Sequence, residues 1–145
     1  MSSTYMTFLK TAALPFQGLN REFWLEAEID TSSLTIVADD VIQVFNLAAG
    51  WRVLRTNIKV VTPATGTALT LDVGLAAGSE FDAACDLKAA AGTEYESVDG
   101  TDSGAAGGAG TYFSTADTLD VSFPTVTAVT VNPVFKVRAL VRAIN

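Results

Sequence analysis

Apolar and polar residues alternate with a period of two along most of the chain, which predicts β-strands with one buried face. The clearest example is the run 69–75, where leucine and valine alternate with small or polar residues. The turn-type sequences Ala-Ala-Gly at 48–50 and Pro-Ala-Thr-Gly at 63–66 divide the region 39–75 into three strands. The pattern predicts that these strands form a meander around which the rest of the protein is built.

Further strands are predicted on both sides of this meander, because the same alternation recurs there. Within the meander, residues 40–47 have apolar side chains at positions of both parities, which predicts a central strand covered on both faces. Pro124 is expected to end a strand, because proline has no N–H to donate to a neighbouring strand. Outside the meander, the expected strands are 23–30, 34–37, 117–123 and 134–144.

One segment departs from the alternation and predicts a helix. Ser79 and Asp82 have the spacing of a capping box, an alanine-rich stretch follows, and Gly92 supplies a stop signal. We therefore expect one short helix over about 80–91. Isolated helices of this length are marginal in water, so it should dock on the sheet, with Cys85 as a small buried residue.

The predicted elements indicate a mainly β fold. Many short strands, one helix and no strand–helix repetition are typical of an antiparallel, jelly-roll-like β-sandwich. Residues 21–145 are expected to form a single domain, large enough to bury a core without crosslinks. Residues 1–20 are expected to form an extended N-terminal arm, along its own domain or across a neighbouring subunit. The alternative is a frayed terminus.

Composition narrows the possible partners and locations. The formal net charge of −7 disfavours binding to nucleic acid, which needs a basic surface. A single cysteine excludes a disulfide within the chain, which suits synthesis in a reducing cytoplasm. The chain has neither a long apolar run nor a signal-like N-terminus, so we expect a soluble protein that is made inside a cell and has no membrane partner.

The residues needed for common catalytic chemistry are sparse. The sequence contains no histidine, which removes the usual general base, the usual zinc ligand and every nucleophile that depends on histidine. Neighbouring carboxylates could form a glycosidase-like pair. Each of these carboxylates, however, lies at the start of a predicted strand or helix, where aspartate commonly caps backbone N–H groups. We therefore expect no enzyme activity. These pairs are Asp39/Asp40, Asp82/Asp86 and Asp117/Asp120.

A glycine-rich segment is the remaining candidate for a ligand site. Residues 99–104 alternate oxygen donors with glycine, and Glu94 and Glu96 precede them, as in a calcium loop. The segment lacks the distal glutamate of such a loop, and turn chemistry explains it equally well. We therefore predict no metal and no cofactor, and we interpret 99–110 as a surface loop or a segment ordered by a partner.

The distribution of charge is more informative than any motif. Six of the nine basic residues lie on two predicted strands, which would form a basic patch if the strands are neighbours. Such a patch could dock an acidic surface; the alternative is ordinary solvated strand faces. Apolar side chains of the arm and Trp24 on a polar strand face are further candidates. The candidate contact residues are Tyr5, Phe8, Leu9, Phe16, Trp24, Arg52, Arg55, Lys59, Lys136, Arg138 and Arg142.

Several motifs resemble those of a known group of proteins. A motif of the form D-x-I-x-x-F-x-x-x-A-G begins at Asp40, L-D-V-G follows at 71–74, and A-D-T-L-D-V lies at 116–121. From Asp39 onward, the runs DDVIQVFNLAAGWRVLRTNIKVVTPATGTALTLDVGL, AACDLKAAAGT and YFSTADTLDVSF resemble small virion proteins of tailed bacteriophages. These are strand and turn residues rather than a reactive constellation.

The resemblance implies a capsid decoration (cement) protein with no catalytic residues. Such a protein binds the major capsid protein on the capsid exterior, usually as a small homo-oligomer, with a trimer favoured here. The alternative is a tail-associated or host-recognition module whose exposed aromatics near the glycine-rich loop contact a receptor. Tyr95, Tyr112 and Phe113 are available for this. A third hypothesis, which the sequence disfavours, is that the protein is a glycan hydrolase.

Overall fold

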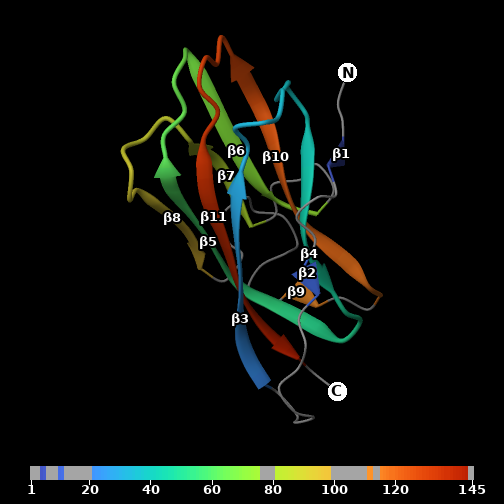
Figure 1. The fold of residues 1–145 in the computed structure, drawn as a ribbon. Helices are drawn as coiled ribbons and strands as arrows, with labels where there is room; N and C mark the ends of the chain where they lie inside the picture. The colour runs from blue at the N-terminus through green and yellow to red at the C-terminus, as the bar shows by residue number, and fades with distance from the viewer. Residues whose placement is uncertain are drawn as a thin grey trace.

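Two β-sheets packed face to face form the protein (Figure 1). The computed structural model describes residues 4–5, 10–11, 21–75, 81–98, 111–112 and 115–143. The strands are β1 (Thr4–Tyr5), β2 (Lys10–Thr11), β3 (Arg21–Asp30), β4 (Val41–Leu47), β5 (Trp51–Thr62), β6 (Ala68–Gly74), β7 (Asp82–Asp86), β8 (Glu94–Val98), β9 (Thr111–Tyr112), β10 (Asp117–Thr127) and β11 (Val134–Ala143).

The strand order confirms the predicted antiparallel sandwich. Sheet A has the order β1-β4-β10-β6-β7, and β2 also pairs with β4. Sheet B has the order β3-β11-β5-β8, and β9 also pairs with β5. All pairings are antiparallel except those of β1 and β2, which run parallel to β4. Among the described residues there is no helix, and hence none that could cross a membrane.

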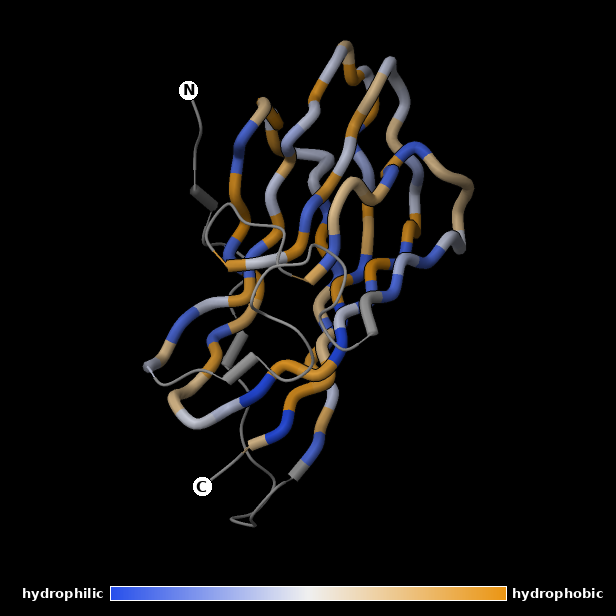
Figure 2. The backbone as a smooth tube through the Cα atoms, turned by 180° about the vertical axis from the view of Figure 1, so that it is seen from behind, coloured by the Kyte–Doolittle hydropathy of each residue, from blue (hydrophilic) through white to orange (hydrophobic). Residues whose placement is uncertain are grey.

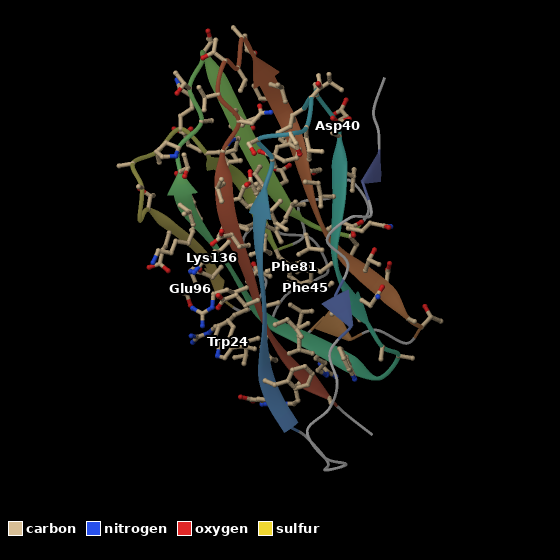
Figure 3. The ribbon with its side chains drawn as sticks, in the orientation of Figure 1. Trp24, Asp40, Phe45, Phe81, Glu96 and Lys136 are labelled. Atoms are coloured by element: carbon tan, nitrogen blue, oxygen red, sulfur yellow. The ribbon has the colours of Figure 1, made fainter. Side chains whose placement is uncertain are left out.

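The core lies between the two sheets and is built from alternate residues of each strand. The tube in Figure 2 shows this alternation of hydrophobic and hydrophilic positions along the strands. Phe123 of β10 and Phe135 of β11 meet edge to face across the core, with ring centroids 6.3 Å apart. Phe45 and Phe81 also lie between the sheets and are fully buried (Figure 3). The apolar faces predicted from the alternation are therefore the faces that pack together.

The three strands predicted as a meander do not pair with one another. β4 and β6 belong to sheet A and β5 to sheet B, so the chain crosses between the sheets at both turns. In sheet A, β10 lies between β4 and β6 and pairs with both. The prediction was wrong because turn residues show where the chain reverses, whereas the pairing partner is set by long-range packing.

β4 has buried residues at both odd and even positions, but the cause is not the predicted one, a strand covered on both faces. The pairing with β10 shifts between Gln43, opposite Asp120, and Phe45, opposite Leu119. Val44 is therefore the extra residue of a bulge, and both Val44 and Phe45 are fully buried. β4 is buried on one face with a local bulge, rather than covered on both faces.

The predicted helix over about 80–91 is wrong, because part of this segment forms β7, an edge strand paired with β6. Phe81 and Cys85 are both fully buried, as a helix would place them, but a bulge achieves the same spacing. Leu71 pairs with Cys85 and Val73 with Asp82, so β7 holds one more residue than β6 over this stretch. The four-residue apolar spacing of a bulged strand thus imitated a helical turn.

Ala84 occupies the strained position of this bulge. Its φ of 56° is in the left-handed region, which side chains with a Cβ disfavour. The N–H of Ala84 donates to Oδ1 of Asp72 on β6, at 2.7 Å, and the N–H of Ala83 donates to Oδ1 of Asp82, at 2.8 Å. Carboxylates therefore satisfy the backbone groups that the bulge removes from the ladder.

The predicted end of one strand and the existence of another also differ from the structure. β10 continues past Pro124 to Thr127, with a register shift against β6 between Ser122 and Thr125. Proline is tolerated there because the ladder is already interrupted. The segment 34–37 is not a strand; it is part of a loop in which the buried carboxylate of Asp40 accepts a hydrogen bond from the N–H of Val37.

The N-terminal arm and the glycine-rich loop lie largely outside the described residues. Only the backbones of β1 and β2, both beside β4, can be placed from residues 1–20. The segment 99–110 is outside the described residues altogether, although β8 and β9 on either side of it pair with consecutive parts of β5.

The bulge can be tested with two glycine substitutions at neighbouring exposed alanines. Ala84→Gly should raise the free energy of unfolding by about 0.5 kcal/mol, because relief of the left-handed strain outweighs the entropy of glycine. Ala83→Gly should lower it by about 0.5–1 kcal/mol. Urea unfolding of both variants measures the difference. In a helix, both substitutions would destabilise by about 1 kcal/mol, so equal losses would contradict the bulged strand.

Candidate functional site

The outward side chains of sheet B form an ordered array of charges. Consecutive residues of a strand point to opposite faces, so the outward residues of β3, β11, β5 and β8 align in rows across the sheet. Figure 3 shows Trp24, Glu96 and Lys136 together on this side of the molecule. The rows are Glu28–Lys136–Lys59–Glu94, Glu26–Arg138–Asn57–Glu96, Trp24–Leu140–Arg55 and Glu22–Arg142–Arg52.

The structure brings the six basic candidate residues together, because β5 and β11 are neighbours over their whole length. It also borders them with acidic strands, β3 on one side and β8 on the other. Six basic side chains (Arg52, Arg55, Lys59, Lys136, Arg138, Arg142) thus face the same way as six acidic ones (Glu22, Glu26, Glu28, Asp30, Glu94, Glu96). The surface is a basic stripe between acidic borders, with no net charge.

Ion pairs join the stripe to its borders. Their side chains are between 37% and 49% exposed, so each pair contributes at most about 1 kcal/mol to stability and mainly orients its side chains. Arg138 Nε lies 3.2 Å from Glu26 Oε2 without an aligned hydrogen bond, so this contact is purely an ion pair. The other pairs are Lys136–Glu26 at 3.9 Å, Arg55–Glu96 at 3.4 Å, and Arg142–Glu22.

Trp24 is the exposed aromatic residue of this face. The guanidinium carbon of Arg138 lies 4.6 Å from the centre of its ring, which is a cation–π contact. The contact covers part of the indole and leaves 43% of the residue exposed, and Leu140 lies opposite it on β11. An exposed tryptophan fixed by an arginine is typical of the residues that dominate protein–protein interfaces.

Asn57 is a polar residue of this face that the sequence analysis did not single out. It is only 6% exposed and lies between Arg138 and Glu96. Among the described residues, no donor reaches its Oδ1. A buried acceptor without a donor is costly, which makes Asn57 a point where a docked partner could gain a hydrogen bond. Its outward parity was readable from the sequence, but its burial depends on the neighbouring strands.

The candidate residues of the arm cannot be placed on this face. Only the backbone of Tyr5 is described, in β1, and Phe8, Leu9 and Phe16 lie outside the described residues. The seven candidates on the body of the protein are all on the outward face of sheet B.

At least one member of each acidic pair considered as a catalytic candidate accepts a hydrogen bond from a backbone amide. Besides Asp40 and Asp82, Asp117 accepts from the N–H of Thr118 at 2.8 Å, and Asp86 accepts from the N–H of Lys88 at 2.9 Å. These contacts are those expected of aspartates that cap turns and strand ends. In the part of the chain that the structure describes, no group of three or more acidic or cysteine side chains could hold a metal ion. The possible calcium loop, 99–104, lies outside that part.

A hollow of about 690 Å³ lies at one end of the sandwich, between the loops 31–38 and 126–132. Aliphatic residues, among them Val37 and Val131, and several hydroxyl groups line it. The described residues of its lining include no titratable side chain.

Tyr95 closes the edge of the sandwich between β8 and β7. Its hydroxyl group donates to the backbone oxygen of Asp86 at 3.0 Å. Burial, and then the nearby carboxylate of Asp86, raise the pKa of the Tyr95 phenol. Of the aromatic residues considered for receptor contact, Tyr95 therefore has a structural role, while the side chains of Tyr112 and Phe113 lie outside the described residues.

Tyr95→Phe should lower the free energy of unfolding by about 1 kcal/mol at pH 7, because the hydrogen bond to Asp86 is lost. Since the folded-state pKa is raised, the contribution of the neutral phenol is fully present below the unfolded pKa of about 10 and is lost as the pH rises through the folded value. Urea unfolding at pH 7, 9 and 10.5 should show the gap between the two proteins narrowing above pH 10. A gap independent of pH would contradict this role.

Comparison with known proteins identifies the fold. No protein-family model matches the chain, and no curated protein sequence matches it. Three solved structures do. One chain in the capsid of Ralstonia phage GP4 aligns with a TM-score of 0.69 and 16% identity, over 94% of this chain and 99% of that chain.

The other two structures are also of phage capsids. A chain of the cyanophage Pam1 capsid asymmetric unit aligns with a TM-score of 0.58 and 19% identity, over 92% of this chain and 93% of that one. A chain of the acidic stable capsid of Helicobacter pylori bacteriophage KHP30 aligns with a TM-score of 0.57 and 14% identity, over 86% and 89%. At these identities the likeness is one of fold: this chain has the β-sandwich fold found in small chains of phage capsid structures.

Proposed function

We propose that this chain is a capsid decoration (cement) protein of a tailed bacteriophage, a non-enzymatic component that binds the outer surface of the major capsid lattice. The observation that carries the proposal is the near end-to-end alignment with a chain of the phage GP4 capsid, which covers almost all of both chains. A chain of about this length and fold is thus present in that capsid structure.

The described surface also favours a protein that docks on a lattice over one that forms it. Obligate subunits interlock through large, mainly apolar interfaces. Among the described residues, only Trp24, Val37 and Val131 are large hydrophobic residues with substantial exposure. The domain therefore buries its own core and presents a mostly polar exterior, which suits a subunit added to an existing shell.

Stabilisation then follows from mass action. A protein that binds the assembled shell and not its separated subunits lowers the free energy of the shell by the free energy of binding. A homo-oligomer, which we propose to be a trimer, would bind through several copies of the same contact and so gain avidity. The arm residues Tyr5, Phe8, Leu9 and Phe16 are proposed to add apolar contacts with neighbouring subunits.

We propose the outward face of sheet B as the docking surface. Trp24 supplies an exposed anchor, Asn57 supplies a hydrogen-bond acceptor, and the alternation of basic stripe and acidic borders supplies orientation. Since the face has no net charge, we expect it to match a partner of complementary pattern rather than any acidic surface.

The role can be tested with particles from a phage that lacks the gene. If the protein decorates the capsid, shells form without it, and purified protein added back binds saturably at hundreds of copies per particle and raises the temperature at which the shell opens. Quantitative gel analysis and cryo-electron microscopy measure occupancy and position. Failure of shells to form would indicate a lattice subunit, and a handful of copies per particle would indicate a tail or host-recognition component.

The docking face can be tested with charge swaps that preserve net charge. In Glu22→Arg with Arg142→Glu, the ion pair can re-form in the opposite sense, so stability should change by less than about 1 kcal/mol. The pattern seen by a partner is reversed, so binding to undecorated shells should weaken roughly tenfold. The swap Arg55→Glu with Glu96→Arg probes the other border in the same way. If the charge-swapped proteins fold and bind shells as tightly as the wild type, the outward face of sheet B is not the docking surface.

A further inference from the structure

The edges of the two sheets are protected to different degrees. An open edge strand presents unpaired N–H and C=O groups to any extended chain, so proteins usually shorten, bulge or cover such strands. In sheet A, β7 is five residues long and bulged, and β4 is bordered by β1 and β2. In sheet B, β8 is five residues long and tied to β7 by Tyr95.

β3 has none of these protections in the part of the chain that the structure describes. It is ten residues long and pairs with β11 at every residue from Arg21 to Asp30, without a register shift. No described strand pairs with its other edge. Figure 1 shows β3 as the outermost long strand of its sheet. A long, regular edge of this kind is a template for the addition of one more strand.

The side chains of β3 restrict what that strand can be. Four of its five outward residues are acidic: Glu22, Glu26, Glu28 and Asp30. A second β3 added with its apolar side toward the core would place acidic residues opposite acidic residues, and like charges directly opposite are destabilising. The edge therefore disfavours a second copy of itself.

The two acidic side chains of β3 that have no ion pair with a described residue lie at one end of the strand. Glu22 and Glu26 have ion pairs with arginines of β11. Glu28 and Asp30 have no ion pair among the described residues. Hydrogen bonds from the side chain of Ser32 and then from its backbone N–H lower the pKa of the Asp30 carboxyl group. On the inward side, Phe23 is partly buried, so an added strand could cover it with an apolar residue.

We propose that β3 is a docking site for an extended segment of a partner protein that adds to sheet B as an edge strand and carries lysine or arginine at alternate positions. Backbone hydrogen bonds to the edge of β3 with which no described strand pairs would hold the segment, and its basic side chains would meet Glu28 and Asp30. This inference goes beyond the proposed function, because strand addition at β3 does not require a capsid.

The test uses the purified full-length protein and a ten-residue synthetic peptide, blocked at both ends, in which lysine alternates with valine. A peptide with glutamate in place of lysine is the control. We expect saturable binding of the lysine peptide only. Amide hydrogen exchange should slow at alternate residues of β3, those whose N–H groups point away from β11, and remain unchanged in β7 and β8.

A matched pair of variants separates strand addition from general attraction to an acidic protein. Glu28 and Glu94 are the two ends of one row across sheet B, so each charge reversal changes net charge equally. Glu28→Lys should weaken peptide binding about fivefold more than Glu94→Lys, because only Glu28 lies directly opposite the added strand. The exchange pattern of each free variant confirms that it is folded.

Several results would overturn the proposal. These are no saturable binding, equal weakening by the two variants, or bound peptide without slowed exchange in β3. Concentration-dependent protection of β3 in the peptide-free protein would show instead that a second copy covers this edge. None of these outcomes bears on whether the protein binds capsids, which the particle experiment decides separately.

Discussion

The packing of two sheets against one shared core is the constraint on which the other features of this protein depend. Strands from both sheets contribute alternate residues to that core, and Phe123 and Phe135 meet across it. Because each strand must keep its apolar face inward, an extra residue is accommodated as a bulge rather than as a reversal of the face. The bulges at Val44 and Ala84 both follow from this requirement.

The outward face of sheet B is a consequence of the same packing. Once the inward positions of β5 and β11 are buried, their basic side chains point outward in adjacent rows, and a register shift in β5 between Val53 and Arg55 keeps Arg52 on this face. The acidic residues of β3 and β8 then border them and form the ion pairs. The result is a patterned, neutral surface with Trp24 within it, on a protein whose overall charge is −7. Such a surface selects a partner by its charge pattern more than by net attraction.

Much of this was predictable from local sequence, and the failures have physical causes. The bounds of β5 and the apolar face of β6 follow directly from alternation and turn residues. The helix prediction failed because the spacing of Phe81 and Cys85 fits both a helical turn and a bulged strand. Arg55, Lys59 and the basic residues of β11 follow from the alternation, whereas Arg52, which has the opposite parity to Arg55, reaches the same face only through a register shift of β5 against β11. Asn57 was missed because its burial comes from side chains on other strands.

The sequence by itself determined most of the apolar positions that face the core and where the chain turns between β4, β5 and β6, because both depend on the chemistry of near neighbours along the chain. Only the tertiary structure decided which strands pair. β10 separates β4 from β6, and β11 joins β3 to β5, although these partners are far apart in the sequence. The physical reason is that every residue except proline offers the same backbone N–H and C=O groups, so pairing is chosen by how whole faces fit together.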